Sequence, residues 1–241
     1  MITGGGSGIG RELAGCFAGQ GCRVLVAGRR RTALEATRRK QPDRIRVVVA
    51  DVATPEGREA LAEEFRDSSP HRCFLVHNAA IVTPLKPLCR ITLEEWRAIQ
   101  ATNVEAPLFL TQRLLPFLGA GSRILHVSSG AAHAPFENMG AYCTSKAALH
   151  MMYQCLRDEL RDNGIAVGSV RPGIVNTPMQ ETLRNAPPEE FPRAPGYRRL
   201  KEEGELLDPA EVARFLCRLL MEVDSENFSA KEWDIRDGDV S

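Results

Sequence analysis

The sequence predicts an α/β protein: a doubly wound, Rossmann-type parallel sheet with helices on both faces, in a single domain over residues 1–241. Two observations lead to this prediction. Short apolar segments alternate with segments of helical period, and a glycine-rich turn directly precedes the first helical segment. Such alternation builds a parallel sheet covered by helices. A chain of 241 residues with ordinary apolar and charged fractions can bury one core of this kind.

The expected strands are separated from one another by helical segments. They are Met1–Thr3, Arg23–Ala27, Ile45–Val49, Cys73–Val76, Arg123–Val127, Ile165–Val170 and Glu232–Ile235. The first is short for a central strand, since about five or six residues are usual. Parallel sheets of this type bind ligands beyond the carboxyl ends of their strands, so we expect functional residues directly after them.

Two of the expected helices begin at capping sequences. Thr92 with Glu95, and Asp208 with Glu211, each place a capping side chain three residues before an acid. The segment 187–196, in contrast, is rich in Pro, Glu and Arg and has no regular period. We expect a mobile loop there, within a substrate loop of about residues 177–207.

The composition restricts the partners of the protein. Its 31 Lys and Arg residues balance 31 Asp and Glu residues, so no net charge attracts nucleic acid or an anionic membrane surface. Seven cysteines without a CxxC pair or zinc-type spacing predict reduced thiols, no disulfide and no metal site. No apolar run has membrane-spanning length, and no signal-peptide pattern is present. We expect a cytoplasmic protein with a small-molecule partner.

The glycine-rich turn is the expected cofactor site. It reads Thr3-Gly4-Gly5-Gly6-Ser7-Gly8-Ile9-Gly10 and has the spacing TGxxxGxG. Glycine permits the close backbone approach that phosphate binding at a helix N-terminus requires. A flexible turn is the alternative for this motif alone. The residues expected to contact a dinucleotide are Gly4, Ser7, Gly8, Ile9 and Gly10.

The residues after the second strand predict which cofactor is bound. An acid there would hydrogen-bond the adenosine ribose and favour NAD, whereas an Arg accommodates the 2′-phosphate of NADP. The chain has Arg29-Arg30-Arg31, so we expect NADP(H), with Arg29 as the leading contact and Arg30 as the second. A solvated basic cluster that begins the next helix is the alternative, particularly for Arg31. Later strand ends add Asp51 and Val52 near the adenine, and Asn78, Ala79 and Ala80 at the floor of the site.

Tyr142 and Lys146 are the strongest candidates for chemistry. They are four residues apart, so on a helix they share one face. Tyrosine ordinarily ionises near pH 10, and a neighbouring ammonium lowers that pKa toward the working pH of a general acid or base. The alternative for so short a motif is a surface Tyr with a Lys one turn on. We expect both residues to contact the cofactor as well.

With TGxxxGxG, Asn78-Ala79, Asn103, Ser129, YxxxK and Arg171-Pro172-Gly173 in this order, the chain resembles the short-chain dehydrogenase/reductase family over nearly its full length. The resemblance implies that Ser129, thirteen residues before Tyr142, binds the substrate oxygen. It also implies that Asn103 holds a water linking Lys146 to solvent. The further cofactor contacts that it implies are Pro172, Gly173, Ile174, Val175 and Thr177. His77 and Ala80 depart from the family's Asn and Gly, which affects the cofactor floor and not the chemistry.

Within the family, residues 128–146 and 232–237 are similar to the sepiapterin reductase and benzil reductase branch. This implies an NADPH-dependent oxidoreductase that reduces an aromatic ketone, a diketone or a pterin side-chain carbonyl, with Tyr142 as general acid/base. Asp234 matches the acid that anchors the pterin, or is an ordinary charged strand end. The expected apolar substrate wall comprises Ala131, Pro135, Phe136, Met139, Cys143 and the loop 179–207 with Phe191 and Tyr197. Core or loop packing is the alternative for each, and a subunit contact is a further alternative for Phe136 and Met139.

Other function classes and the assembly remain open at this point. A regulator that binds NADP(H) and reports its redox state without turnover has no chemical need of Ser129, Tyr142 and Lys146 together. Nucleic-acid binding rests only on residues 29–31 and 38–40, without interleaved aromatic side chains. The resemblance implies a homodimer or homotetramer, and the apolar face 108–118 is either its interface or part of the core.

Overall fold

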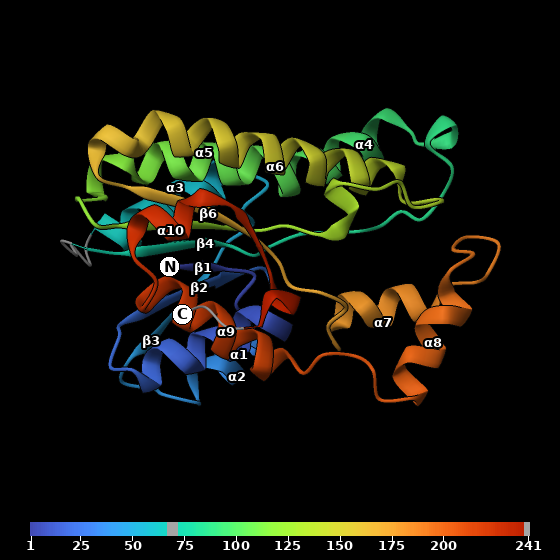
Figure 1. Ribbon diagram of the computed structural model, residues 1–241, viewed down its shortest axis with the longest axis horizontal. Coiled ribbons are helices and arrows are strands. Elements are labelled where there is room, and N and C mark those ends of the chain that lie inside the picture. The colour runs from blue at the N-terminus through green and yellow to red at the C-terminus, as the bar shows by residue number, and fades with distance from the viewer. Residues whose placement is uncertain (67–71, 239–241) are drawn as a thin grey trace.

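The computed structural model describes residues 1–66 and 72–238, which form a parallel seven-stranded sheet between two layers of helices (Figure 1). The strand order is β3-β2-β1-β4-β5-β6-β7. The strands are β1 (Ile2–Thr3), β2 (Val24–Gly28), β3 (Ile45–Val49), β4 (Phe74–His77), β5 (Arg123–Val127), β6 (Ala166–Arg171) and β7 (Glu232–Asp234). The predicted fold class and its doubly wound sheet are confirmed.

The helices are α1 (Gly8–Gly19), α2 (Arg31–Arg38), α3 (Pro55–Arg66), α4 (Leu93–Gln100), α5 (Ala106–Leu114), α6 (Gly140–Leu160), α7 (Pro178–Asn185), α8 (Ala194–Glu202), α9 (Pro209–Met221) and α10 (Ser225–Ala230). Several helices begin at a residue whose side chain caps them, among them α4, α7, α9 and α10. Thr92 and Glu95 form a capping box at α4, and Asp208 caps α9 by accepting a hydrogen bond of 2.8 Å from the amide of Ala210.

Each face of the sheet has its own hydrophobic core. Helices α1 and α9 pack on one face, through side chains such as Leu13 and Leu216. Helices α3, α5 and α6 pack on the other (Figure 1). Leu110 and Leu114 are fully buried there, so the apolar face 108–118 is mostly core, and the interface interpretation does not apply to these side chains.

Strand β1 lies at the centre of the sheet although it has only two residues. Ile2 pairs with Val26 of β2 and Val76 of β4. The hydroxyl of Thr3 then accepts hydrogen bonds from the amides of Asn78 (3.0 Å) and Ala79 (3.1 Å). A side chain therefore continues the connection between the two halves of the sheet beyond the end of the backbone ladder.

The segment expected as an irregular substrate loop contains two helices. Helices α7 and α8 lie outside the sheet beside one end of α6 (Figure 1). The prediction of a loop over 187–196 differs from the structure from Ala194 onward, where α8 begins with Pro195 in its first turn. The loop was expected because the segment is rich in Pro, Glu and Arg and lacks a regular period, but the first turn of a helix tolerates Pro because its amide would have no intrahelical partner.

Candidate active site

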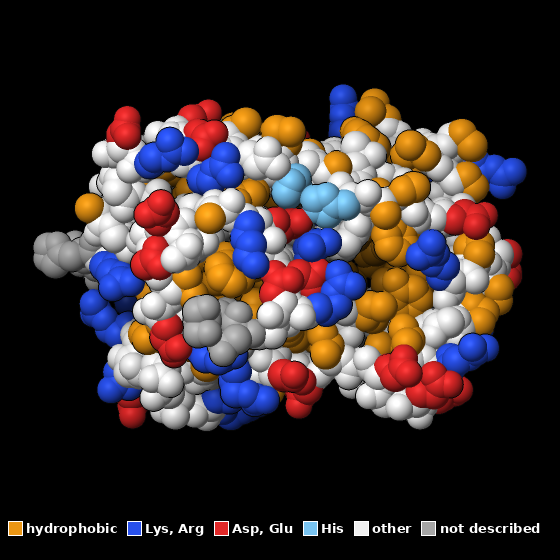
Figure 2. Space-filling view, viewed as in Figure 1, with side chains coloured by type: hydrophobic (Ala, Val, Ile, Leu, Met, Phe, Trp, Pro, Cys, Tyr) orange, Lys and Arg blue, Asp and Glu red, His pale blue; other side chains and the backbone are white. Residues whose placement is uncertain are grey.

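A cleft of about 1590 Å³ opens at the carboxyl ends of the strands, where the strand order reverses between β1 and β4. The glycine-rich turn and the ends of β2 and β3 line one end of it. The start of α6 and the α7–α8 pair line the other, where Figure 2 shows hydrophobic side chains gathered in a hollow. The cleft therefore has a polar end and an apolar end.

The glycine-rich turn is held from below by Asn78. The Asn78 amide group donates a hydrogen bond of 2.9 Å to the carbonyl oxygen of Thr3. Gly4 and Gly8 have φ angles of +67° and +51°, a region that side chains rarely adopt. A Cβ on Gly10 would lie 2.6 Å from both Asn78 Nδ2 and the carbonyl oxygen of Gly4. Gly4, Ser7, Gly8 and Ile9 line the cleft as expected, whereas Gly10 packs beneath the turn.

Two arginines mark the polar end. Arg29 and Arg30 line the cleft with Asp51 and Val52, while Arg31 begins α2 and is not among the lining residues. Arg29 Nη1 is 4.0 Å from Asp51 Oδ2, and the Arg29 side chain is 67% exposed. An ion pair this long and this exposed contributes little. The Arg29 guanidinium is therefore available to an anionic ligand.

These residues fit a nicotinamide dinucleotide. The N-terminus of α1 faces the cleft, where its amides favour a phosphate. A Cβ on Gly8 would lie 2.9 Å from Thr177 Cγ2, so the two sides of the site approach closely and only glycine leaves room. The remaining predicted contacts, Asn78, Ala79, Pro172, Gly173, Ile174, Val175 and Thr177, all line the same cleft.

His77, which departs from the family pattern, lies below the cofactor floor. Its side chain is buried, and Nε2 lies 2.8 Å from the Thr111 hydroxyl, within hydrogen-bond distance. Burial holds the pKa of His77 well below its usual value, so the ring is neutral. His77, which stands where the family pattern has Asn, is therefore a neutral residue that packs beneath the cleft.

Ser129, Tyr142 and Lys146 meet in the middle of the cleft. Tyr142 and Lys146 share one buried face of α6. Lys146 Nζ donates a hydrogen bond of 2.8 Å to the carbonyl oxygen of Val127, the last residue of β5, and lies 5.7 Å from the centre of the Tyr142 ring. Ser129 follows β5 by two residues, and its hydroxyl oxygen accepts a hydrogen bond of 3.1 Å from the amide of Ala131. All three residues line the cleft.

Burial shifts the pKa of both groups of this pair. It raises the pKa of Tyr142 to about 12, although the Ser129 hydroxyl acts in the opposite direction. It lowers the pKa of Lys146 to about 8. The predicted lowering of the Tyr142 pKa is thus not found in the chain itself, because the sequence analysis considered the charge of Lys146 and not desolvation. Tyr142 retains its proton at neutral pH, and Lys146 remains largely charged.

Asn103 lies behind the cleft and not in its wall. It belongs to a π-helical turn, Ala101–Glu105, between α4 and α5. Its amide group donates to the Ile81 carbonyl and the Ser145 hydroxyl, both at 2.9 Å, and accepts from the Ile81 amide at 2.9 Å. Asn103 therefore ties the cleft wall at Ile81 to α6. Its role in holding a water stays a prediction.

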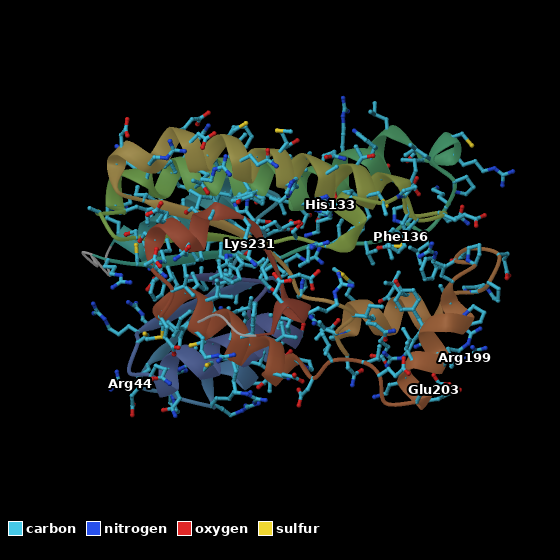
Figure 3. The ribbon with its side chains drawn as sticks, in the orientation of Figure 1. Arg44, His133, Phe136, Arg199, Glu203 and Lys231 are labelled. Carbon is cyan, nitrogen blue, oxygen red and sulfur yellow. The ribbon has the colours of Figure 1, made fainter. Side chains whose placement is uncertain are left out.

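The apolar end includes part of the expected substrate wall. Phe136, labelled in Figure 3, lies across the cleft from α7 and α8 and lines it with Ala131, Met139, Met179 and Tyr197. Phe191 is instead fully buried in the core under α7 and α8. Pro135 and Cys143 are not among the lining residues, and burial raises the pKa of the Cys143 thiol. For Phe191 and Cys143 the packing alternative is therefore correct.

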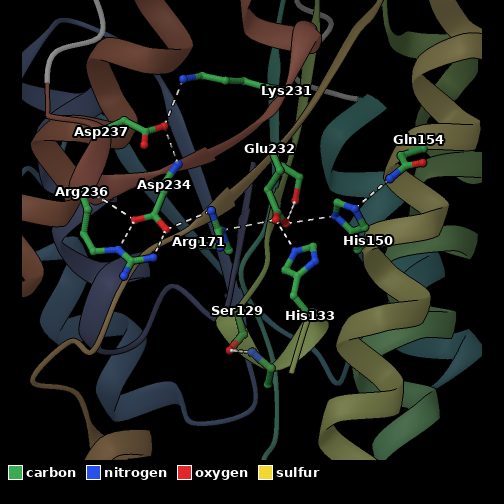
Figure 4. A network of polar contacts seen from close by, with 12 residues as sticks. Ser129, His133, His150, Gln154, Arg171, Lys231, Glu232, Asp234, Arg236 and Asp237 are labelled. Carbon is green, nitrogen blue, oxygen red and sulfur yellow. Dashed lines mark hydrogen bonds and ion pairs between the residues drawn. The ribbon is translucent and has the colours of Figure 1, made fainter. Parts of the chain in front are cut away.

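A polar network beside the cleft was not predicted from the sequence (Figure 4). Its centre is Glu232, which contacts His133 (2.5 Å), His150 (3.1 Å) and the Ser169 hydroxyl (2.9 Å). These residues are distant in sequence, so no local spacing could have indicated them. The network continues to Asp234, which lines the cleft but is already paired with Arg171 (3.1 Å) and Arg236. The Arg236 hydrogen bond lowers the pKa of Asp234 to about 2.

The Rossmann fold, the dinucleotide cleft and the Ser, Tyr and Lys set define a nicotinamide-dependent oxidoreductase. Residues 1–188 match the family model described as short chain dehydrogenase. The chain belongs to the short-chain dehydrogenase family. Among the residues that the structure describes, no helix is long and apolar enough to cross a membrane.

Two relatives and two solved structures show the extent of the similarity. A benzil reductase ((S)-benzoin forming) of Bacillus cereus is 33% identical over 163 residues, 66% of this chain and 64% of that protein, so the match spans less than two thirds of that relative. The benzil reductase of Bacillus subtilis is 29% identical over 98% of each chain.

A short-chain dehydrogenase/reductase of Saccharomyces cerevisiae superposes with a TM-score of 0.91 at 27% identity, over 98% of this chain and 95% of that chain. A 3-ketoacyl-(acyl-carrier-protein) reductase of Brucella melitensis complexed with NADH has the same fold, with a TM-score of 0.80 at 24% identity, over 97% and 93% of the two chains.

The packing beneath the glycine-rich turn can be tested with Gly10→Ala. The added methyl group would displace Asn78 from Thr3 or distort Gly4, and overpacking of this kind costs about 1–3 kcal/mol. We expect weaker binding of the reduced nicotinamide dinucleotide, measured by fluorescence titration. Gly15→Ala on the same helix, where the new atom meets only the flexible Lys40 side chain at 3.2 Å, should bind like the unaltered protein. Equal affinity of both variants would contradict this account of the turn.

Proposed function

We propose that this protein is an NADPH-dependent carbonyl reductase that converts an aromatic ketone, a diketone or a pterin side-chain carbonyl to an alcohol. The observation that carries the proposal is the position of Ser129, Tyr142 and Lys146 between the polar and apolar ends of one cleft. The similarity to benzil reductases supports the substrate class, because benzil is an aromatic diketone.

Tyr142 is the proton donor in this proposal. With its pKa raised to about 12 by burial, its hydroxyl carries a proton at neutral pH and can donate it to the carbonyl oxygen of the substrate. A reduced nicotinamide, when bound, supplies the hydride for the carbonyl carbon. The Ser129 oxygen accepts from the Ala131 amide, and its O–H, which interacts with Tyr142 in the unliganded chain, can donate to the same substrate oxygen and stabilise the charge that develops there.

Lys146 supports the transfer electrostatically. Its ammonium is held beside Tyr142 by the carbonyl oxygen of Val127 and stabilises the phenolate that remains after the proton leaves. Asn103 is a positioning residue, since it connects α6 to the cleft wall and does not line the cleft.

NADP(H) is the proposed cofactor because of the charge after β2. Arg29 and Arg30 line the cleft there, and both are exposed. The neighbouring acid, Asp51, uses its Oδ1 to accept a hydrogen bond of 3.0 Å from the Ala53 amide. The two guanidinium groups are therefore suited to a 2′-phosphate.

We also propose that the protein is a cytoplasmic homodimer or homotetramer. Exposed apolar side chains on α4, α5 and α6, namely Leu93, Phe109 and Met151, support a further protein contact on that side. The balanced charge gives no support to a nucleic-acid partner.

The activity is tested by mixing the purified protein with NADPH or NADH and with benzil, sepiapterin or a simple aliphatic ketone, following the absorbance of the reduced nicotinamide. We expect turnover with NADPH and an aromatic diketone or pterin. Tyr142→Phe should lower kcat/KM by at least about 100-fold, because it removes the transferable proton. Tyr153→Phe is the matched control, since this residue lies on the same helix, bonds to the Ser229 carbonyl and does not line the cleft.

Near-normal turnover in Tyr142→Phe would contradict the assignment of the proton donor. Tight NADPH binding without turnover of any carbonyl compound would indicate a redox-sensing regulator and not a reductase.

The cofactor preference is tested with Arg29→Gln and Arg30→Gln. Each variant should raise the KM for NADPH by about 10-fold or more, the range expected for loss of a hydrogen bond to a charged group, and leave the KM for NADH nearly unchanged. Arg31→Gln removes the same charge one residue further on, outside the cleft, and should change neither constant. A preference of the unaltered protein for NADH would show the cofactor assignment to be wrong.

The pH dependence of reduction should follow Lys146. The folded pKa of this lysine is lowered to about 8, so the ammonium is present below that pH and is lost above it. Because the pKa of Tyr142 is raised to about 12, its proton stays in place over this range. We therefore expect kcat/KM to fall as pH rises through about 8. Lys146→Arg keeps its charge to much higher pH, so any remaining activity should lack this decline; an unchanged decline would exclude Lys146 as its source.

A further inference from the structure

Three side chains of the types that bind zinc converge beside β7 (Figure 4). His133 comes from the segment after Ser129, His150 from α6 and Glu232 from β7. Their ligand atoms all lie within 4.8 Å of one another. His133 Nε2 is 2.5 Å from one carboxylate oxygen of Glu232, and His150 Nδ1 is 3.1 Å from the other. Nothing in the oxidoreductase chemistry proposed above uses these side chains.

We propose that His133, His150 and Glu232 form a binding site for one divalent transition-metal ion, with Zn²⁺ as the best match. Bonds of about 2.0–2.2 Å place two ligands of a tetrahedral zinc ion roughly 3.3 Å apart. The two separations from Glu232, 2.5 Å and 3.1 Å, are both somewhat shorter than this value, so the side chains must move slightly apart to admit one ion. Two imidazoles and one carboxylate suit zinc better than magnesium or calcium, which prefer oxygen ligands.

The surroundings supply support for the ligands. The Ser169 hydroxyl donates a hydrogen bond of 2.9 Å to Glu232 Oε1 and orients the carboxylate. The Gln154 amide nitrogen, Nε2, lies 2.8 Å from His150 Nε2. Metal binding at Nδ1 requires this amide to be turned over, which exchanges its nitrogen and oxygen. With the amide oxygen toward this nitrogen, His150 Nε2 carries the proton and Nδ1 presents its lone pair to the ion. A second hydrogen bond of this kind is the usual partner of a metal-binding histidine.

The site has an entry path for the ion. Glu232 is buried at 7% side-chain exposure, but His133 is 39% exposed. Figure 3 labels His133, and Figure 2 shows pale-blue histidine side chains at the surface in the same region. An ion can therefore enter from solvent, and a water molecule can complete its coordination.

Arg171 opposes the ion and sets the expected affinity. Its Nε lies 3.4 Å from Glu232 Oε2, and its guanidinium also pairs with Asp234. A second positive charge at this distance weakens cation binding, so we expect a dissociation constant in the micromolar range and not the much tighter binding of structural zinc sites. The same repulsion predicts that removing the Arg171 charge raises the affinity.

Occupation of the site would connect two parts of the active site. His133 is four residues after Ser129, and His150 is four residues after Lys146. The ion would thus link the Ser129 segment to α6. Because it binds only the folded chain in this geometry, it should also raise the thermal stability.

The test uses the full chain without a histidine tag, stripped of metal by a chelator. Zn²⁺ is titrated by calorimetry, and Co²⁺ by its visible absorption, which reports tetrahedral coordination. We expect one ion per chain and a higher Tm with zinc. His133→Ala and His150→Ala should each lower the affinity at least about 10-fold and abolish the Tm increase, and Arg171→Gln should raise the affinity. Cys89→Ser and Cys155→Ser, which remove exposed thiols elsewhere, should bind zinc like the unaltered chain.

Several results would overturn the proposal. One is the absence of a stoichiometric ion. Another is an affinity that stays the same in His133→Ala, a variant at an exposed position that should fold normally. A third is a folded Arg171→Gln variant that binds no more tightly, since it would show that the ion does not lie beside Glu232.

Discussion

The hydrogen bond between Lys146 and the carbonyl oxygen of Val127 determines the geometry of the active site. A buried ammonium needs a partner, and this one takes the last carbonyl group of β5. The contact holds the start of α6 against the strand, while the apolar side chains of α6 pack on the sheet. Ser129, two residues beyond Val127, is thereby brought to the same part of the cleft as Tyr142. The catalytic arrangement is thus a consequence of how one helix is attached to one strand.

The glycine-rich turn, at the polar end of the cleft, is likewise held by hydrogen bonds, here between Thr3 and Asn78 in the middle of the sheet. Thr3 joins β1 to the residues after β4 through its hydroxyl, and Asn78 returns a hydrogen bond to the Thr3 carbonyl. The glycine-rich turn rests on this pair, because Gly10 leaves no room for a side chain against Asn78. A central strand of two residues can join the two halves of the sheet because the side chains of Thr3 and Asn78 make further hydrogen bonds beyond its end.

The sequence predicted what depends on local spacing and missed what depends on distant contacts. Most strands were recognisable because they are short apolar runs. Tyr142 with Lys146 was recognisable because four residues correspond to about one helical turn. Helix α8 was missed because its first residues lie in a segment rich in Pro, Glu and Arg without a regular period, and Pro195 occupies the first turn, where a helix tolerates it. The raised pKa of Tyr142 and the meeting of His133, His150 and Glu232 follow from burial and tertiary packing, which one-dimensional patterns do not contain.

The burial of Tyr142 also makes the two directions of the proposed reaction unequal. A phenol with a pKa of about 12 is ionised in only about one molecule in 10⁵ at pH 7. Reduction starts from the protonated form, which is nearly the whole population. Oxidation of an alcohol starts from the phenolate. To populate the phenolate, the pKa of Tyr142 must be lowered by a positive charge near the ring beyond the charge that Lys146 provides. The protein alone therefore holds Tyr142 in its proton-donating form and not in its proton-accepting form.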